Sequence, residues 1–132
     1  MIRYIKNFFH STAQHSAYWK DRKIDWKTQY FDTWNHPHRF LISNVLKTFN
    51  WHSLLEVGTG AGANLANIVM NFKGKQLGGT DINPDAIAYA QGAFQGAFFK
   101  VCPVDDIMMS DSSVDVILTD MCLIYVDPKK ID

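Results

Sequence analysis

Three glycines within seven residues, directly after a short apolar run, constrain this chain more than any other feature. The apolar run covers residues 53–57, and the glycines follow in Glu56-Val57-Gly58-Thr59-Gly60-Ala61-Gly62. Residues 61–72 then repeat apolar side chains at helical spacing. A strand that turns through glycines into a helix presents backbone N–H groups at the helix start, and glycine lets a ligand approach that backbone closely. The segment therefore predicts a ligand-binding turn between a strand and a helix.

The same alternation continues along the chain. Further strands are expected at 76–80, 97–101 and 114–119, a helix capped by Asn83 at 83–91, and another helix start at Asp127-Pro128. Strands that alternate with helices are typical of a parallel sheet with right-handed crossovers. The sequence therefore predicts an α/β fold, a Rossmann-like parallel sheet with flanking helices that ends after its fourth strand.

The N-terminal third differs from this pattern. Residues 1–50 hold eight basic and three acidic residues, a net charge of +5, whereas residues 51–132 carry −5. All four tryptophans lie in the first 51 residues. We predict a helical N-terminal cap over 1–50 and a partial Rossmann-like domain over 51–132. The opposite charges favour packing of the cap on the domain, and contact of the cap with an anionic substrate is the alternative.

Two apolar faces are expected within the cap. Trp19, Trp26, Tyr30 and Trp34 follow at steps of seven, four and four, which places them on one helical face. We expect this stripe to pack the cap on the domain, with a lid over a bound ligand as the alternative. His36-Pro37 opens a second helix because proline is tolerated in a first helical turn. Its expected apolar side consists of Phe40, Leu41, Val45, Leu46 and Phe49.

Composition excludes several classes of function. The formal net charge is zero, which argues against strong electrostatic binding to nucleic acid or to a membrane surface. No apolar run approaches the roughly 18 residues that span a bilayer. Cys102 and Cys122 lie far apart, which indicates neither a disulfide framework nor a metal pair, so a cytoplasmic location is expected. The pair His36 and His38 lacks the spacing of a metal site, and no metal is predicted.

An acid at the end of the second predicted strand points to a nucleoside. Asp81 follows Gly62 by 19 residues, where a carboxylate can bind both ribose hydroxyls. Gly58, Gly60 and Ala63 satisfy the G-x-G-x-x-G/A pattern of dinucleotide-binding domains such as NAD-dependent oxidoreductases. The acid Glu56 before the first glycine and the long segment before the strand favour a different cofactor.

These segments resemble the class I S-adenosylmethionine-dependent methyltransferases. Residues 54–62 are similar to the first motif of that family, residues 79–87 to its second motif, and residues 112–118 to the start of its fourth strand. The resemblance runs from about Trp51 to Pro128 and implies S-adenosylmethionine as the cofactor. A complete domain of that family has seven strands, usually in the order 3-2-1-4-5-7-6, so this chain supplies its first four. The free edge of the fourth strand is expected to invite association into a homo-oligomer.

The resemblance implies a role for each matching residue. The turn of Gly58, Thr59, Gly60 and Gly62 would run beneath the methionine part of the cofactor, and Glu56 would hold the methionine ammonium group. Asp81 would bind the ribose and Ile82 would pack on the adenine. Contacts to the adenine edge would come from Val104 and Asp105, although Pro103 stands where the family often has an acid.

The sequence indicates the reaction and the methyl acceptor less clearly than it indicates the cofactor. The segment 120–123 lacks the signature of nucleic-acid amino methyltransferases, and no Pro-Cys pair resembles that of cytosine-C5 enzymes. We therefore expect methyl transfer to a small-molecule acceptor, with Asp120 and Tyr125 as candidate catalytic residues. Two alternatives are a dinucleotide-binding oxidoreductase and a cofactor-binding module or fragment without activity.

Overall fold

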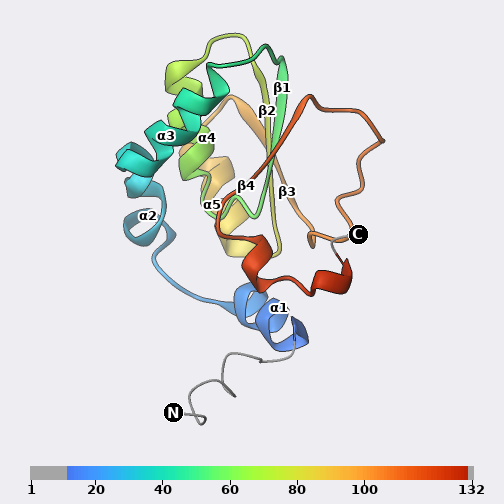
Figure 1. Ribbon diagram of the computed structural model, residues 1–132. Helices are drawn as coiled ribbons and strands as arrows, with labels where there is room; N and C mark the ends of the chain where they lie inside the picture. The colour runs from blue at the N-terminus through green and yellow to red at the C-terminus, as the bar shows by residue number, and fades with distance from the viewer. Residues whose placement is uncertain (1–11, 131–132) are drawn as a thin grey trace, which may run out of the picture.

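The computed structural model describes residues 12–130, and residues 1–11 and 131–132 lie outside the described part. Four strands form one parallel sheet: β1 (Ser53–Val57), β2 (Gln76–Asp81), β3 (Ala97–Val101) and β4 (Val116–Thr119). Their order is β3-β2-β1-β4 (Figure 1). This arrangement confirms the predicted α/β fold, and it follows the 3-2-1-4 order that the family resemblance implies.

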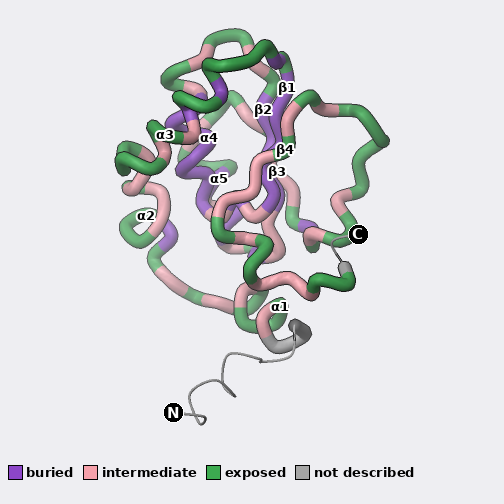
Figure 2. The backbone as a smooth tube through the Cα atoms, viewed as in Figure 1, coloured by how far each residue is buried: buried purple, intermediate pink, exposed green. Residues whose placement is uncertain are grey.

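The helices that flank the sheet cover one of its faces. Leu54, Leu77, Phe99 and Leu118 lie on that face, one from each strand. They belong to the main hydrophobic core, together with Leu65 and Ile68 of α4 (Ala63–Asn71) and Leu46 of α3 (Pro37–Leu46). The tube in Figure 2 shows the consequence: burial is concentrated in β1, β2 and α4. This core fixes the carboxyl ends of the central strands, where the glycine turn begins.

Asn83 joins the N-terminal segment to the body. It caps α5 (Pro84–Ala93), because its Oδ1 accepts from the N–H groups of Asp85 and Ala86 at 2.9 and 3.0 Å. Its Nδ2 donates to the carbonyls of Trp19 and Arg22 at 2.7 and 2.9 Å. The side chain is 1% exposed, so every polar atom of a buried residue is used. The predicted cap at Asn83 is confirmed, and it also anchors the end of α1.

The predicted aromatic stripe on one helix is wrong. The segment consists of α1 (Thr12–Asp21), α2 (Trp26–Gln29) and the 3-10 helix η1 (Phe31–Asn35). Asp25 causes the interruption, because its side chain accepts from the N–H groups of Lys27 and Thr28 and starts a new helix. Trp26 is buried in a small core, whereas Trp19 lies beside Tyr125. The two tryptophans therefore pack against different neighbours, although both line the cavity described below.

Most residues of the apolar side predicted for α3 are exposed instead of packed on the body of the fold. Phe40, Leu41 and Val45 are 41%, 64% and 54% exposed, and Phe49 beyond the helix is 46% exposed. Of the five residues expected on that side, only Leu46 is buried. Polar contacts set the rotation of the helix. Arg39 Nη1 and Ser43 Oγ donate to the side chains of Asn64 and Asn67 of α4, both at 2.6 Å.

The fourth strand is shorter than predicted and has a free edge. It begins at Val116, because Asp115 Oδ2 accepts from the N–H groups of His52 and Ser53 and from Ser53 Oγ. Among residues 12–130, β4 pairs with β1 alone, and Ile117 is 62% exposed. Asp127-Pro128 leads into the short 3-10 helix η3 (Pro128–Lys130). No helix in this range is long and apolar enough to cross a bilayer.

Candidate functional site

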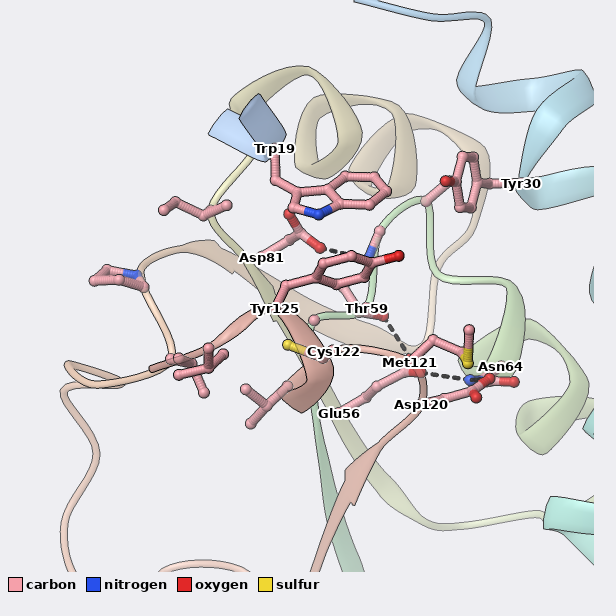
Figure 3. A pocket seen from close by; sticks show the side chains of 18 of the residues that line it. Trp19, Tyr30, Glu56, Thr59, Asn64, Asp81, Asp120, Met121, Cys122 and Tyr125 are labelled. Carbon is pink, nitrogen blue, oxygen red and sulfur yellow. Dashed lines mark hydrogen bonds between the residues drawn. The ribbon is translucent and has the colours of Figure 1, made fainter. Parts of the chain in front are cut away.

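A cavity of about 560 Å³ opens at the carboxyl ends of β1, β2 and β4 (Figure 3). Its wall comes from the glycine turn, the end of β2, the residues after β3, the end of β4, and the aromatic residues of the N-terminal segment. This volume is typical of small-molecule sites, and its place fits the rule that parallel sheets bind ligands beyond the carboxyl ends of their strands.

The glycine turn has the backbone conformation that its sequence predicts. Gly58 and Gly60 have φ of +78° and +55°, values that favour glycine. Gly58 also has no room for a side chain, because a Cβ would lie 2.5 Å from Cβ and Sγ of Cys122. Gly62 differs from its neighbours: it does not line the cavity, and it begins α4 with its backbone against the ring of Phe99.

Glu56 is a buried acid at the floor of the cavity. It is 1% exposed, and its two oxygens accept from Thr59 Oγ1 and Asn64 Nδ2, both at 2.6 Å. Burial raises the pKa of Glu56 to about 7, and the two donors oppose that rise. At neutral pH its carboxyl group is therefore divided between the charged and the neutral form, and a nearby positive charge would favour the charged form.

Asn64 connects Glu56 to a second acid. Its Nδ2 also donates to Asp120 Oδ2 at 3.0 Å, and its Oδ1 accepts from Arg39 Nη1. Burial lowers the pKa of Arg39, and the nearby carboxylates of Glu56 and Asp120 oppose that shift. One amide thus holds two carboxyl groups apart and links them to a cation from α3.

Asp81 lies at the opposite end of the glycine turn. Its Oδ2 accepts from the N–H of Gly60 at 2.8 Å, and its Oδ1 accepts from the N–H of Asn83 at 2.9 Å. Burial raises the pKa of Asp81, and these backbone donors lower it. Each carboxylate oxygen keeps a second lone pair, so the group can still accept from hydroxyl groups of a ligand.

Aromatic and apolar residues cover the same end of the cavity. The rings of Trp19 and Tyr125 meet edge to face with centroids 5.2 Å apart, and Figure 3 shows both beside Asp81. Tyr125 comes from the 3-10 helix η2 (Leu123–Tyr125), which follows β4. Tyr30 lines the cavity farther along. Trp19 thus occupies the lid position that was the alternative for the aromatic stripe, while Trp26 lies in a core.

The structure brings most of the predicted site residues together. Those that line the cavity are Glu56, Gly58, Thr59, Gly60, Asp81, Ile82, Val104, Asp105, Asp120 and Tyr125. Sequence reasoning missed Asn64 and Arg39 as parts of this wall and gave Trp19 a place over the ligand only as an alternative. The signal for Asn64 was a polar residue on the inward side of a helix, beside Leu65. Within residues 12–130, no group of three His, Cys, Asp or Glu residues could hold a metal ion.

Comparison with known proteins identifies the chain's relatives. The model of the family described as "Methyltransferase domain" matches residues 54–132. The plantazolicin methyltransferase BpumL, solved with SAH and a monoazolic desmethylPZN analog, has 23% identity and a TM-score of 0.68 over 92% of this chain and 50% of its own. A Haloferax volcanii protein in complex with the Trm112 methyltransferase activator has 20% identity and a TM-score of 0.65 over 89% and 51%.

A SAM-dependent methyltransferase from Aquifex aeolicus has 23% identity and a TM-score of 0.52 over 74% of this chain and 57% of its own. The chain therefore spans about half the length of the solved structures it is similar to. Among proteins of curated function, none matches it in sequence. The structural likenesses establish a shared fold, and the family model covers more than half of the chain. The chain belongs to the methyltransferase domain family.

Proposed function

We propose that this chain forms the cofactor-binding part of an S-adenosylmethionine-dependent methyltransferase that acts on a small-molecule acceptor. The observation that carries the proposal is the position of Glu56 and Asp81. They end adjacent strands, and the glycine turn between them lines the same cavity. Membership of the methyltransferase domain family favours this cofactor over a dinucleotide.

The groups in the cavity suit the charges of S-adenosylmethionine. Its methionine part carries an ammonium group and a sulfonium, and Glu56 and Asp120 supply nearby carboxyl groups. Since the pKa of Glu56 is about 7, a bound cation would convert the group to its charged form and would release a proton. Gly58, Thr59, Gly60 and the start of α4 at Gly62 would form the backbone support beneath the methionine part.

The other end of the cavity suits a nucleoside. Asp81 would accept hydrogen bonds from the ribose hydroxyls, as acids at this place in nucleotide-binding folds do. Ile82 would pack on the adenine, while Val104 would offer its N–H and Asp105 its side chain to the adenine edge. The edge-to-face pair of Trp19 and Tyr125 would close this end from the solvent side.

The cofactor supplies a methyl group on a sulfonium, a leaving group that its positive charge already activates. The protein's contribution is therefore to hold donor and acceptor in line and to exclude water. We place the acceptor at the end of the cavity bounded by Tyr30, Asp120 and Met121, away from Asp81 (Figure 3). The cavity volume of about 560 Å³, which is typical of small-molecule sites, supports a small molecule as the acceptor.

Two further features belong to the proposal. The free edge of β4, with Ile117 exposed, would be covered by association with another strand, from a second copy of the chain or from a longer protein. A module that binds the cofactor without turnover is the second candidate, because the described residues build the cofactor end of the cavity and the chain spans about half the length of the solved structures it is similar to.

Thermal unfolding with added ligand tests the cofactor assignment. S-adenosylmethionine at 10 to 100 times its Kd should stabilise the chain by about 1.4–2.7 kcal/mol, which raises Tm by about 5–10 °C in a domain of this size. Asp81→Ala should remove most of this rise, whereas Asp111→Ala, in the loop away from the cavity, should keep it. A rise with NAD and none with S-adenosylmethionine would overturn the proposal.

A further inference from the structure

Asp120 has one carboxylate oxygen that is held and one that is not. Its Oδ2 lies 3.1 Å from His38 Nε2, 3.0 Å from Asn64 Nδ2 and 3.6 Å from Arg39 Nη1. Its Oδ1 has no hydrogen-bond partner among residues 12–130, and the side chain is 23% exposed at the cavity wall. The hydrogen bond from Asn64, the contact with His38 and the ion pair with Arg39 all lie on the side of Oδ2, which leaves Oδ1 available to a ligand.

His38 is itself held in place by a second imidazole. His36 caps α3, and Pro37 follows as the first residue of the helix. The Nδ1 atoms of His36 and His38 lie 2.9 Å apart, a hydrogen bond when one of the two nitrogens carries a proton and the other is bare. This contact fixes the rotation of the His38 ring and directs Nε2 toward Asp120. The two histidines lack the spacing of a metal site. The contact between their Nδ1 atoms explains their spacing instead.

The backbone on the other side of Asp120 is also fixed. Met121 has φ of +59°, a conformation that is costly for a residue with a side chain. The next residue, Cys122, packs its Cβ and Sγ against the bare Cα of Gly58. The turn after β4 is therefore tied to the glycine turn, which sets the distance between Asp120 and the cavity floor.

The charges around Asp120 come from every element that faces it. Arg39 and His38 of α3 lie on one side, and Glu56 of β1 lies behind the shared amide of Asn64. Arg39 is the one permanent cation of the group, and its side chain is 11% exposed. These groups lie around Oδ2 and leave Oδ1 without a partner among the described residues.

We propose that Asp120 Oδ1 binds the O–H or N–H of the methyl acceptor beside the transferable methyl group and takes its proton, with His38, His36 and Asn64 as positioning residues. This inference rests on the proposed function. As the acceptor's lone pair forms the new bond to the methyl carbon, the carbon–sulfur bond breaks and its electron pair stays on sulfur. The acceptor's proton moves to Asp120 Oδ1 and leaves to solvent with product release. The acceptor class is therefore a hydroxyl or an amine that carries a proton.

Two cofactor analogues test this geometry without a known acceptor. S-adenosylhomocysteine has no group at the methyl position, whereas sinefungin carries an amine there. Binding of both is measured by calorimetry on the full chain. Wild type should favour sinefungin, and Asp120→Asn should reduce that preference about tenfold, because a charge-assisted hydrogen bond is lost. The N–H groups of Asn64 and Arg39 draw the amide oxygen of the variant to their side, so its NH₂ group faces the ligand amine.

Substitutions of His38 distinguish a positioning role from a general structural role. His38→Ala should reduce the preference for sinefungin about threefold and leave S-adenosylhomocysteine binding within about twofold, while His38→Gln, whose amide can still donate to Asp120, should restore part of it. His52→Gln, an exposed histidine away from the cavity, should change neither. An unchanged preference in Asp120→Asn, or equal weakening of both analogues, would overturn the inference alone. If neither analogue binds wild type, the proposed function fails as well.

Discussion

The two central strands and the two outer strands of the sheet differ in how firmly they hold their functional residues. Every residue of β1 is buried, and in β2 only the two end residues are not, whereas β3 and β4 have no buried residue. Glu56 and Asp81, at the ends of the central strands, have both carboxylate oxygens bound by the protein. Asp120, which follows β4, has one oxygen without such a bond from any residue of the described range 12–130.

This difference indicates that the residues around the cavity have two different tasks. A site that binds the same cofactor in every reaction cycle gains from groups that are fixed before binding. An acceptor that changes from one enzyme of a family to another is better met by residues from a variable segment. In this chain α3, which precedes the family match at residues 54–132, supplies two of the three residues that hold Asp120, His38 and Arg39, and the third, Asn64, lies within the match.

The largest expected difference is between two neighbouring residues of β1 and β4. Leu55 and Ile117 are register partners, so their side chains lie on the same face of the sheet, yet they are 2% and 62% exposed. Leu55→Ala should reduce the free energy of unfolding by about 3 kcal/mol, because it leaves a cavity. Ile117→Ala should cost less than about 1 kcal/mol. Urea denaturation measures both, and equal losses would refute the contrast between central and outer strands.

The pH dependence of stability should report the buried acid of β1. The pKa of Glu56 is about 7 in the folded chain against an ordinary value of 4.5, so the folded state binds more protons between these values. The contribution of Glu56 to the free energy of unfolding is present at low pH. It falls by about 3 kcal/mol as the pH rises toward 8. Glu56→Gln should lack this component. Denaturation of wild type and Glu56→Gln at pH 5 and pH 8 measures this difference. An equal change in the free energy of unfolding of both proteins between the two pH values would contradict the assignment.

Two glycines with similar backbone angles separate conformational strain from steric fit. Gly58 and Gly74 have φ of +78° and +71°, but only Gly58 has neighbours that a Cβ would strike. Gly74→Ala should cost about 1 kcal/mol from the backbone alone, and Gly58→Ala should cost about 2 kcal/mol more through its clash with Cys122. Thermal or urea unfolding gives both values. Similar costs would show that the turn after β4 is free to move away from the glycine turn.

The smallest expected effect concerns the attachment of α1. Asn83→Ser keeps a side chain that can cap α5 but is too short to donate to the carbonyls of Trp19 and Arg22. The free energy of unfolding should fall by about 1 kcal/mol. Amide exchange should rise in α1 and stay unchanged in α4. Exchange that rises equally in both helices would show that α1 is not a separately attached element.

The repeating elements of the body were predictable because local patterns determine them. The bounds of β1 and β3, the cap at Asn83 and the inward residues Leu65 and Ile68 follow from apolar runs, helical spacing and capping chemistry. The acids at the ends of β1 and β2 were also recognisable, because their positions relative to the glycines are fixed by the fold itself. The N-terminal segment was predicted less well, because Asp25 interrupts a helix that the aromatic spacing alone suggested.

The α/β order, the glycine turn and the positions of Glu56 and Asp81 could therefore be predicted from local sequence patterns. The buried side of α3 and the surroundings of Asp120 could not, and they became visible in the three-dimensional contacts. The reason is that these features depend on contacts between distant residues: Arg39 with Asn64, Ser43 with Asn67, and His38 with Asp120. An apolar side of a helix is buried only if a partner surface reaches it, and here the side of α3 that faces α4 carries these polar pairs beside Leu46 and Ile42. Such pairs leave no periodic signal in the sequence.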